Sequence, residues 1–257
     1  MTSRRWRRIR LLVMPYLVAV LLLVLWEVLN RLTNISSVIL PAPSTIFGAL
    51  VRHHEVIAQN ALHTFITAMI GFGLGVVTGV VIGFATGISP EIYSSVYPLL
   101  VAFNAIPKVA LLPLFVLWAG IGVVPAVLTA LTLAFFPIAV NVATGLATID
   151  PEMNDLMRSL GARRDEILLK VGIPRAMPFL FASLKIAISL AFVGTVISET
   201  VASNDGIGFL MMSASSSFNV PLVFAGVFVI AVMAVAAYGV CSLVEQRMIR
   251  WAFRVQP

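Results

Sequence analysis

The chain has 257 residues, of which 60% are hydrophobic and only 11% are charged. Soluble domains carry about 25% charged residues, and disordered chains are rich in polar ones, so both classes are excluded. The net charge of +6 does not indicate nucleic-acid binding, because the basic residues lie at the ends of apolar segments. A single cysteine, Cys241, excludes a disulfide framework and a cysteine-rich metal site.

Six apolar segments are long enough to cross a membrane as helices, and none alternates like a barrel strand. They cover residues 11–29, 60–86, 92–118, 123–147, 179–198 and 222–244. The first follows a basic stretch, as in a secretory signal, but it is longer than a signal core and lacks a small-residue cleavage site. We therefore predict an all-α polytopic membrane protein with six transmembrane helices, the first of them uncleaved.

Prolines interrupt three of these segments. Pro15 lies in the first, Pro107 and Pro113 lie in the third, and Pro137 lies in the fourth. A proline within a span frees a backbone carbonyl that needs another partner. We expect these helices to pack against protein or to line a cavity.

The basic residues predict the orientation of the chain. Of the 17 Lys and Arg residues, 13 lie in segments that are cytoplasmic if both termini are inside, and only Arg31 and Arg52 lie in external ones. The 13 are Arg4, Arg5, Arg7, Arg8, Arg10, Arg158, Arg163, Arg164, Lys170, Arg175, Arg247, Arg250 and Arg254. We predict cytoplasmic N- and C-termini, a basic tail over residues 1–10, and one transmembrane domain over residues 11–257.

Five glycines in, and directly after, the second apolar segment are spaced four residues apart. They are Gly71, Gly75, Gly79, Gly83 and Gly87. Such a stripe lets helix backbones approach closely in lipid, so we expect helix packing, within the chain or between two copies. A phosphate-binding loop is rejected because no Lys-Ser or Lys-Thr pair follows these glycines.

The longest cytoplasmic loop, residues 148–178, is expected to hold two short amphipathic helices. Gly161 is suited to end the first helix, and the second is expected from about Arg163 to Val171, with Pro174 stopping it. Such a surface fits either a soluble partner or the lipid headgroups, and periodicity alone does not decide between them.

The same loop carries a recognisable motif. Residues 155–161, with nine residues before Val171-Gly172-Ile173-Pro174, resemble the EAA loop of ABC-importer permeases, which reads Glu-Ala-Ala, three residues, Gly, nine residues, Ile-x-Leu-Pro. Asp155-Leu156-Met157 stands where that family has Glu-Ala-Ala, so the acid is kept and two small residues are replaced by large ones.

Three further segments, in the same order, resemble this family. Residues 40–44 match its Leu-Pro-x-Pro-Ser entry before the core spans. Residues 106–114, followed by Trp-Ala-Gly-Ile-Gly at 118–122, resemble the nitrate/sulfonate/taurine branch in particular. Glu199 and residues 205–208 match the acid and the Gly-Leu-Gly pattern after the fifth span.

The resemblance implies a type I ABC importer permease fold in the inner membrane of a bacterial cell. It implies a homodimer that works with two cytoplasmic ATPase subunits and an external substrate-binding protein, with no nucleic-acid partner. The chain would be a transport subunit, not an enzyme, and it would hold no cofactor, because ATP and Mg belong to the ATPase subunits. The expected solute is nitrate, a sulfonate, taurine or a similar anion, and the alternative is a pyrimidine or flavin vitamin precursor.

The resemblance also assigns roles to residues. In the family, loop 148–178 is the helix that contacts the ATPase subunit, with Gly161 permitting the sharp turn. The residues that carry this contact here would be Asp155, Arg158, Gly161, Ala162, Arg163, Arg164 and Pro174.

Two charged residues are candidates for the translocation pathway. Lys108 lies within the third segment, and a charge there is costly unless it faces a cavity or a partner. It would attract an anionic solute, or it would form a structural pair, for instance with Glu199. Glu199 is the second candidate.

Two further charged groups are expected to be structural. Glu27 and Arg31 can pair because they are four residues apart on one helix. Lys185 is expected to reach toward the cytoplasmic surface from the start of the fifth segment.

The histidines show no recognised metal spacing; they are His53, His54 and His63.

Two other classes of protein remain as alternatives. An ion-coupled secondary transporter would show inverted repeats and acids within the membrane, and no clear repeat is present. Its acids would have to be drawn from residues near the ends of the segments: Glu27, Glu91, Glu199 and Glu245. A non-transporting scaffold would have no use for the Gly-to-Pro spacing of loop 148–178.

Overall fold

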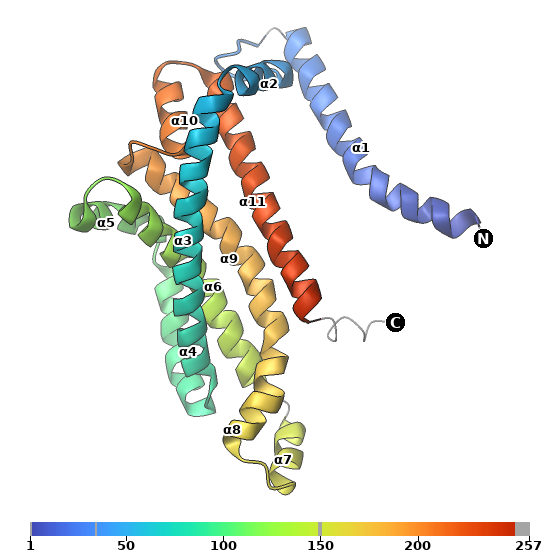
Figure 1. The fold of residues 1–257 in the computed structure, drawn as a ribbon, viewed down its shortest axis with the longest axis vertical. Helices are drawn as coiled ribbons and strands as arrows, with labels where there is room; N and C mark the ends of the chain where they lie inside the picture. Colours follow the sequence, from blue (N-terminus) through green and yellow to red (C-terminus); the bar gives the residue numbers. More distant parts are fainter. Residues whose placement is uncertain (1, 34, 149–150, 250–257) are drawn as a thin grey trace. The chain divides into compact units, whose positions relative to one another are not determined.

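The computed structural model of the chain describes residues 2–33, 35–148 and 151–249, and within these ranges it contains helices and no strand (Figure 1). The side chains of residues 2–12, 16 and 151 are also outside the description. The helices are α1 (Thr2–Thr33), α2 (Pro43–Arg52), α3 (His54–Gly87), α4 (Pro90–Ala105), η1 (Lys108–Leu111), α5 (Leu112–Ala119), α6 (Val123–Ala147), α7 (Pro151–Ser159), α8 (Arg164–Ile167), η2 (Leu168–Gly172), α9 (Ile173–Ala202), α10 (Ile207–Ser216) and α11 (Val220–Met248).

Five of the described helical segments are long and apolar enough to cross a membrane. They are residues 13–33 of α1, the whole of α3 and α6, the continuous helix from Arg164 to Ala202, and α11. Helix α1 begins at Thr2, so the predicted basic tail continues into the first span without a break. Most of the predicted helical segments are confirmed.

The third predicted span, residues 92–118, is broken. Helix α4 and the segment Lys108–Ala119 meet at an angle of 76°, and they make a sixth span only if the bent pair is counted as one. Proline has no amide hydrogen, and it forces the residue before it into an extended conformation. Ile106 accordingly has φ −67° and ψ 125° before Pro107, whereas Pro113 lies in the first turn of α5, where proline is tolerated.

The chain divides into two compact units, which we describe separately. The first comprises residues 1–58 and 210–228. Within it, the Glu27 carboxylate accepts hydrogen bonds from the Ser44 amide at 3.0 Å and the Ser44 hydroxyl at 2.8 Å, and it pairs with Arg31 at 2.6 Å. The predicted Glu27–Arg31 pair is confirmed, and its carboxylate also caps the first turn of α2.

The second unit comprises residues 59–209 and 229–257, and α3, α6 and α9 run side by side in it (Figure 1). The glycine stripe of α3 lies directly on α6. A Cβ atom at Gly79, Gly83 or Gly87 would lie 2.7, 2.6 or 2.8 Å from a carbonyl oxygen of α6. These distances are too short for any side chain. The predicted role of the stripe in packing is confirmed, and the packing is within the chain.

Lys185 forms an ion pair with the last span. Its ammonium contacts the Glu245 carboxylate of α11 at 2.7 Å, and both side chains are largely buried. A charge within a span needs such a partner. Glu245 lies close to the end of α11 at Met248, and the expectation that Lys185 reaches toward the cytoplasmic surface stays a prediction.

Candidate functional site

The first candidate region is the loop between α6 and α9, which begins with the short helix α7. This helix ends in a Schellman turn. The amide of Gly161 donates to the Arg158 carbonyl at 2.9 Å, and the amide of Ala162 donates to the Met157 carbonyl at 3.0 Å. Gly161 has φ +84°, a left-handed conformation that favours glycine. The prediction that Gly161 ends the first helix is confirmed.

The prediction that Pro174 stops the second helix is wrong. Helix α8 leads through the π-helical turn η2 directly into α9, which makes one helix of 39 residues from Arg164 to Ala202. Within the turn, the Ile173 amide bonds to the Leu168 carbonyl, five residues back. Pro174 follows this widened turn at the start of α9, and the helix continues past it.

The remaining predicted loop residues surround the turn. Arg163 precedes α8, and its backbone amide donates to the Glu166 carboxylate at 2.9 Å. The other charged candidates, Asp155, Arg158 and Arg164, are exposed to solvent, and Ala162 is half-buried. Two leucines on α7 and its end, Leu156 and Leu160, are 56% and 75% exposed. The loop thus presents apolar and charged side chains together on an uncovered surface.

The second candidate is Lys108, whose side chain is almost buried, with 8% exposure. Its ammonium donates to the Asn104 side-chain oxygen at 2.6 Å and to the Asn104 carbonyl at 3.2 Å, and it lies 5.2 Å from the ring centre of Phe136. The last carbonyls of α4 have no helical partner, so they attract a cation. The alternative pairing with Glu199 is wrong, because among the described side chains no ion pair joins Lys108 to a carboxylate.

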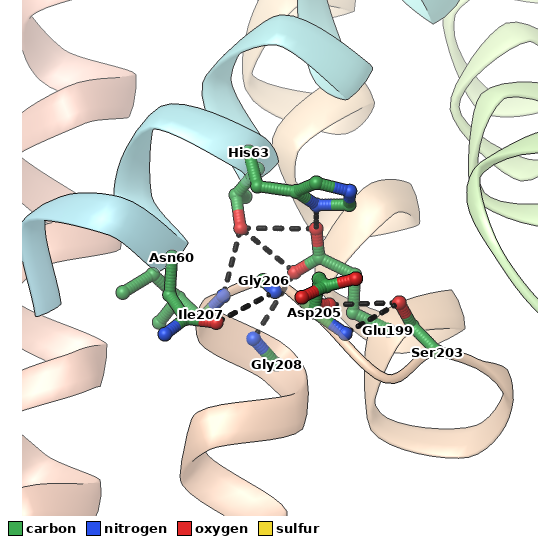
Figure 2. Close-up of polar contacts among 9 residues, drawn as sticks. Asn60, His63, Glu199, Ser203, Asp205, Gly206, Ile207 and Gly208 are labelled. Carbon is green, nitrogen blue, oxygen red and sulfur yellow. Dashed lines mark hydrogen bonds and ion pairs between the residues drawn. The ribbon is translucent and has the colours of Figure 1, made fainter. Parts of the chain in front are cut away.

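Glu199, near the end of α9, is fully enclosed, with 1% exposure. Its carboxylate accepts a bond from the Thr64 hydroxyl, at 2.9 and 2.8 Å to the two oxygens, and one from the Gly208 amide at 3.0 Å (Figure 2). The Nδ1 atom of His63 lies 3.6 Å from the same carboxylate. Residues from α3, α9 and the start of α10 thus meet at one buried acid.

Three consecutive backbone amides at the start of α10 bond to side chains of two other helices. The Gly206 amide donates to the Asn60 side-chain oxygen at 2.8 Å, and the Ile207 amide donates to the Thr64 hydroxyl at 2.8 Å (Figure 2). The Gly208 amide donates to Glu199. We call these six residues (Asn60, Thr64, Glu199, Gly206, Ile207 and Gly208) the amide clasp. The first turn of a helix leaves such amides without partners, and an acid there is favourable.

The two glycines of the amide clasp are required by its geometry. Gly206 has φ +100°, and a Cβ atom there would collide with the Glu199 carboxylate. A Cβ atom at Gly208 would lie 2.5 Å from the Val196 carbonyl and 2.6 Å from Cβ of Glu199. The Gly-Ile-Gly pattern after the fifth span therefore has a physical cause, which is the close approach of α10 to α9.

Sequence reasoning did not identify His63 and Thr64 as partners of Glu199, or Asn60 as a partner of Gly206. A signal was present, because Asn60 and Thr64 are polar residues four apart at the start of an apolar segment, and such residues share a helix face. Because Asn60 and Thr64 are far from residues 199–208 in sequence, their contacts with that segment could not be inferred.

Comparisons with known proteins agree with this architecture. The family described as "Binding-protein-dependent transport system inner membrane component" matches residues 75–250. The formylaminopyrimidine transport permease ThiX of Halalkalibacterium halodurans is 29% identical over 92% of this chain and 95% of its own. The riboflavin permease RibX of Chloroflexus aurantiacus is 33% identical over 90% and 87%, and the taurine permease TauC of Escherichia coli is 27% identical over 98% and 94%.

The fold also resembles a solved transporter. The inward-facing MetNI methionine ABC transporter aligns with a TM-score of 0.56 at 23% identity, over 80% of this chain and 97% of the matched chain. This likeness supports the helical permease fold.

Proposed function

Because the chain belongs to the binding-protein-dependent transport system inner membrane component family, and so is the multi-pass permease subunit of an ABC importer, we propose that two copies form the translocation path. Permeases of this family work in the inner membrane with ATPase subunits and a substrate-binding protein. A homodimer is the simplest assembly for one permease sequence. ATP and Mg would be bound by the ATPase subunits, and both termini would face the cytoplasm.

The observation that carries the coupling role of loop 148–178 is its rigid connection to a span. Helix α7 ends in a hydrogen-bonded Schellman turn, and α8 belongs to the same 39-residue helix as α9. A displacement of the loop by an ATPase subunit would therefore move α9 directly. Such rigid-body movement is what alternating access requires. Pro174 would contribute by fixing the direction in which α9 leaves the loop.

The exposed leucines of α7 favour a protein partner for this loop. Leu160 and Leu156 are four residues apart, with charged residues beside them. An apolar pair rimmed by polar groups is typical of a protein interface. Asp155, Arg158, Arg163 and Arg164 would then set the register of the contact.

Photocross-linking tests this contact. A benzophenone amino acid at position 160 is expected to cross-link to the ATPase subunit in native membranes. The control position is Ile121, which is 67% exposed and lies in a loop that the predicted topology places outside. Cross-linking at position 160 to lipid only would show that the loop lies on the membrane surface instead.

Of the two pathway candidates, the local geometry favours Lys108. Its ammonium lies beside an aromatic ring at a break between two helices, and its partner Asn104 is neutral. An anionic solute could therefore still gain from the charge. The Glu199 carboxylate already accepts bonds from its own chain, so we assign it a positioning role.

For the substrate, we propose a small organic solute delivered by the binding protein. A sulfonate or another small anion suits the charge of Lys108, and TauC is a taurine permease. The second candidate is a heteroaromatic vitamin precursor, which is supported by the similarity to RibX and ThiX. Competition among taurine, riboflavin and formylaminopyrimidine for uptake by the reconstituted importer distinguishes the two candidates.

A further inference from the structure

One helix joins the proposed ATPase contact to the amide clasp. It begins at Arg164 in the loop and ends at Ala202, three residues beyond Glu199. At 1.5 Å per residue, its 39 residues extend about 58 Å. A movement of the loop therefore arrives at the other end of α9 through one unbroken helix.

The amide clasp lies at a joint of the chain. Residues 206–208 belong to the unit that contains α3, α6 and α9, while α10 passes into the other unit after Phe209. Ile207, at the centre of the clasp, is completely buried. The clasp therefore holds the first turn of α10 immediately before the chain leaves the unit of the spans.

The clasp bonds are suited to carry movement because they are buried, directional and attached to two helices. Asn60 and Thr64 hold two amides from α3, and Glu199 holds the third from α9. Buried amides that lose such partners are not compensated by water. The first turn of α10 must therefore follow α3 and α9 or leave its amides unsatisfied.

We propose that Glu199 is a positioning residue that, with Thr64, makes the segment 203–219 move together with α9 when ATP drives the coupling loop. With both termini cytoplasmic, this segment lies on the outer side, where the binding protein delivers its solute. The proposal rests on the coupling role proposed above for loop 148–178.

The experiment follows the two ends of this connection separately. In a Cys241→Ala background, an environment-sensitive fluorophore is attached either to Arg175→Cys, at the start of α9, or to Ser215→Cys, on α10. Both positions are exposed. The purified complex with its ATPase subunits is reconstituted in nanodiscs, and the emission change on adding ATP, Mg and vanadate is measured.

The test variant is Thr64→Val, which removes the hydroxyl at nearly constant volume, and Thr64→Ser restores the hydroxyl. The matched control is Thr86→Val on the same helix, because the buried Thr86 hydroxyl bonds to the Ile82 carbonyl of its own helix. In Thr64→Val we expect the signal at Ser215 to fall by up to about tenfold, because losing a hydrogen bond to a charged group lowers the equilibrium constant for the linked movement by about that factor. The signal at Arg175 should remain, and Thr64→Ser and Thr86→Val should keep both signals.

The outcomes separate the two proposals. If the label at Arg175 does not respond in the unaltered chain, the coupling role of the loop is wrong. If it responds while the label at Ser215 is silent, or still responds fully in Thr64→Val, the clasp proposal is overturned. If Thr64→Val does not fold, Asn60→Ala, which removes one clasp acceptor, should reduce the Ser215 signal in the same direction. An unchanged signal in that variant also overturns the proposal.

Discussion

Gly161 provides a sharp perturbation of the coupling loop. Its φ of +84° places it in the left-handed region, which costs a residue with a Cβ atom about 1–2 kcal/mol. That range reduces the ratio of folded to unfolded turn about 5- to 30-fold. Apart from Gly161 and its two chain neighbours, none of the described residues has an atom within 4 Å of a Cβ built at Gly161, so the cost comes from the local backbone alone.

This reasoning predicts an order among variants. Gly161→Ala and Gly161→Leu should have similar effects, and Gly161→Asn should be milder because asparagine tolerates left-handed backbone. The assay reconstitutes the importer in liposomes and measures solute transported per ATP hydrolysed. We expect the solute transported per ATP to fall in the first two variants by at most about 5- to 30-fold, the change in the ratio of folded to unfolded turn.

Normal uptake by Gly161→Leu would refute the coupling role of the turn. A leucine variant that is far worse than the alanine variant would refute the backbone explanation, because it would show that side-chain size matters. Membrane insertion, checked by the yield of intact dimer, is the control for both variants.

The other predictions concern packing and intramembrane charges. Gly83→Ala places a Cβ 2.6 Å from a carbonyl of α6 and should destabilise the purified permease by about 1–3 kcal/mol. Gly73→Ala on the same helix should be neutral, since nothing outside its chain neighbours and its own helix backbone lies within 4 Å of the added Cβ among the described residues. Equal melting temperatures for Gly83→Ala and Gly73→Ala would contradict the packing account. Lys108→Ala should lose transport but keep assembly, and unchanged uptake would refute its pathway role. Glu245→Gln leaves the Lys185 ammonium without its carboxylate and should cost about 3–5 kcal/mol. Combining it with Lys185→Met should recover much of that loss in thermal unfolding, and a strictly additive result would show that the two residues do not interact.

The parts of the fold that could be predicted from sequence are those fixed by local pattern. The lengths of the apolar segments correctly predicted most of the helices, and the four-residue spacing of the glycines correctly predicted the packing face of α3. The turn at Gly161 and the Glu27–Arg31 pair were also predictable, because each depends on residues close together in the chain.

The predictions that failed relied on local sequence rules at positions where contacts or backbone geometry could not be read from the local sequence. Pro174 was expected to stop a helix, but the helix continues past it after a π-helical turn. Lys185 pairs with Glu245 of the last span, a partner that sequence reasoning did not assign to it. Glu199 was considered as a partner of Lys108. The structure instead places the Lys108 ammonium, next to the break at Pro107, against the Asn104 side chain.

The amide clasp could not be predicted in full because it joins distant segments. Asn60 and Thr64 lie more than a hundred residues before Glu199. Sequence reasoning noticed the acid and the two glycines as parts of a motif, without a physical reason for them. The structure supplies the reason, since Gly206 and Gly208 leave room for the amides of α10 to reach the side chains of α3 and α9.

Affinity purification from the native membrane tests the central claim most directly. The chain, tagged and extracted in mild detergent, is analysed by mass spectrometry and by native mass. The account predicts two permease copies with two subunits that carry an ATP-binding phosphate loop, and it predicts that this association weakens when the exposed Leu160 is replaced by aspartate. A folded permease dimer that emerges without any ATPase subunit would contradict the account and would favour ion-coupled transport.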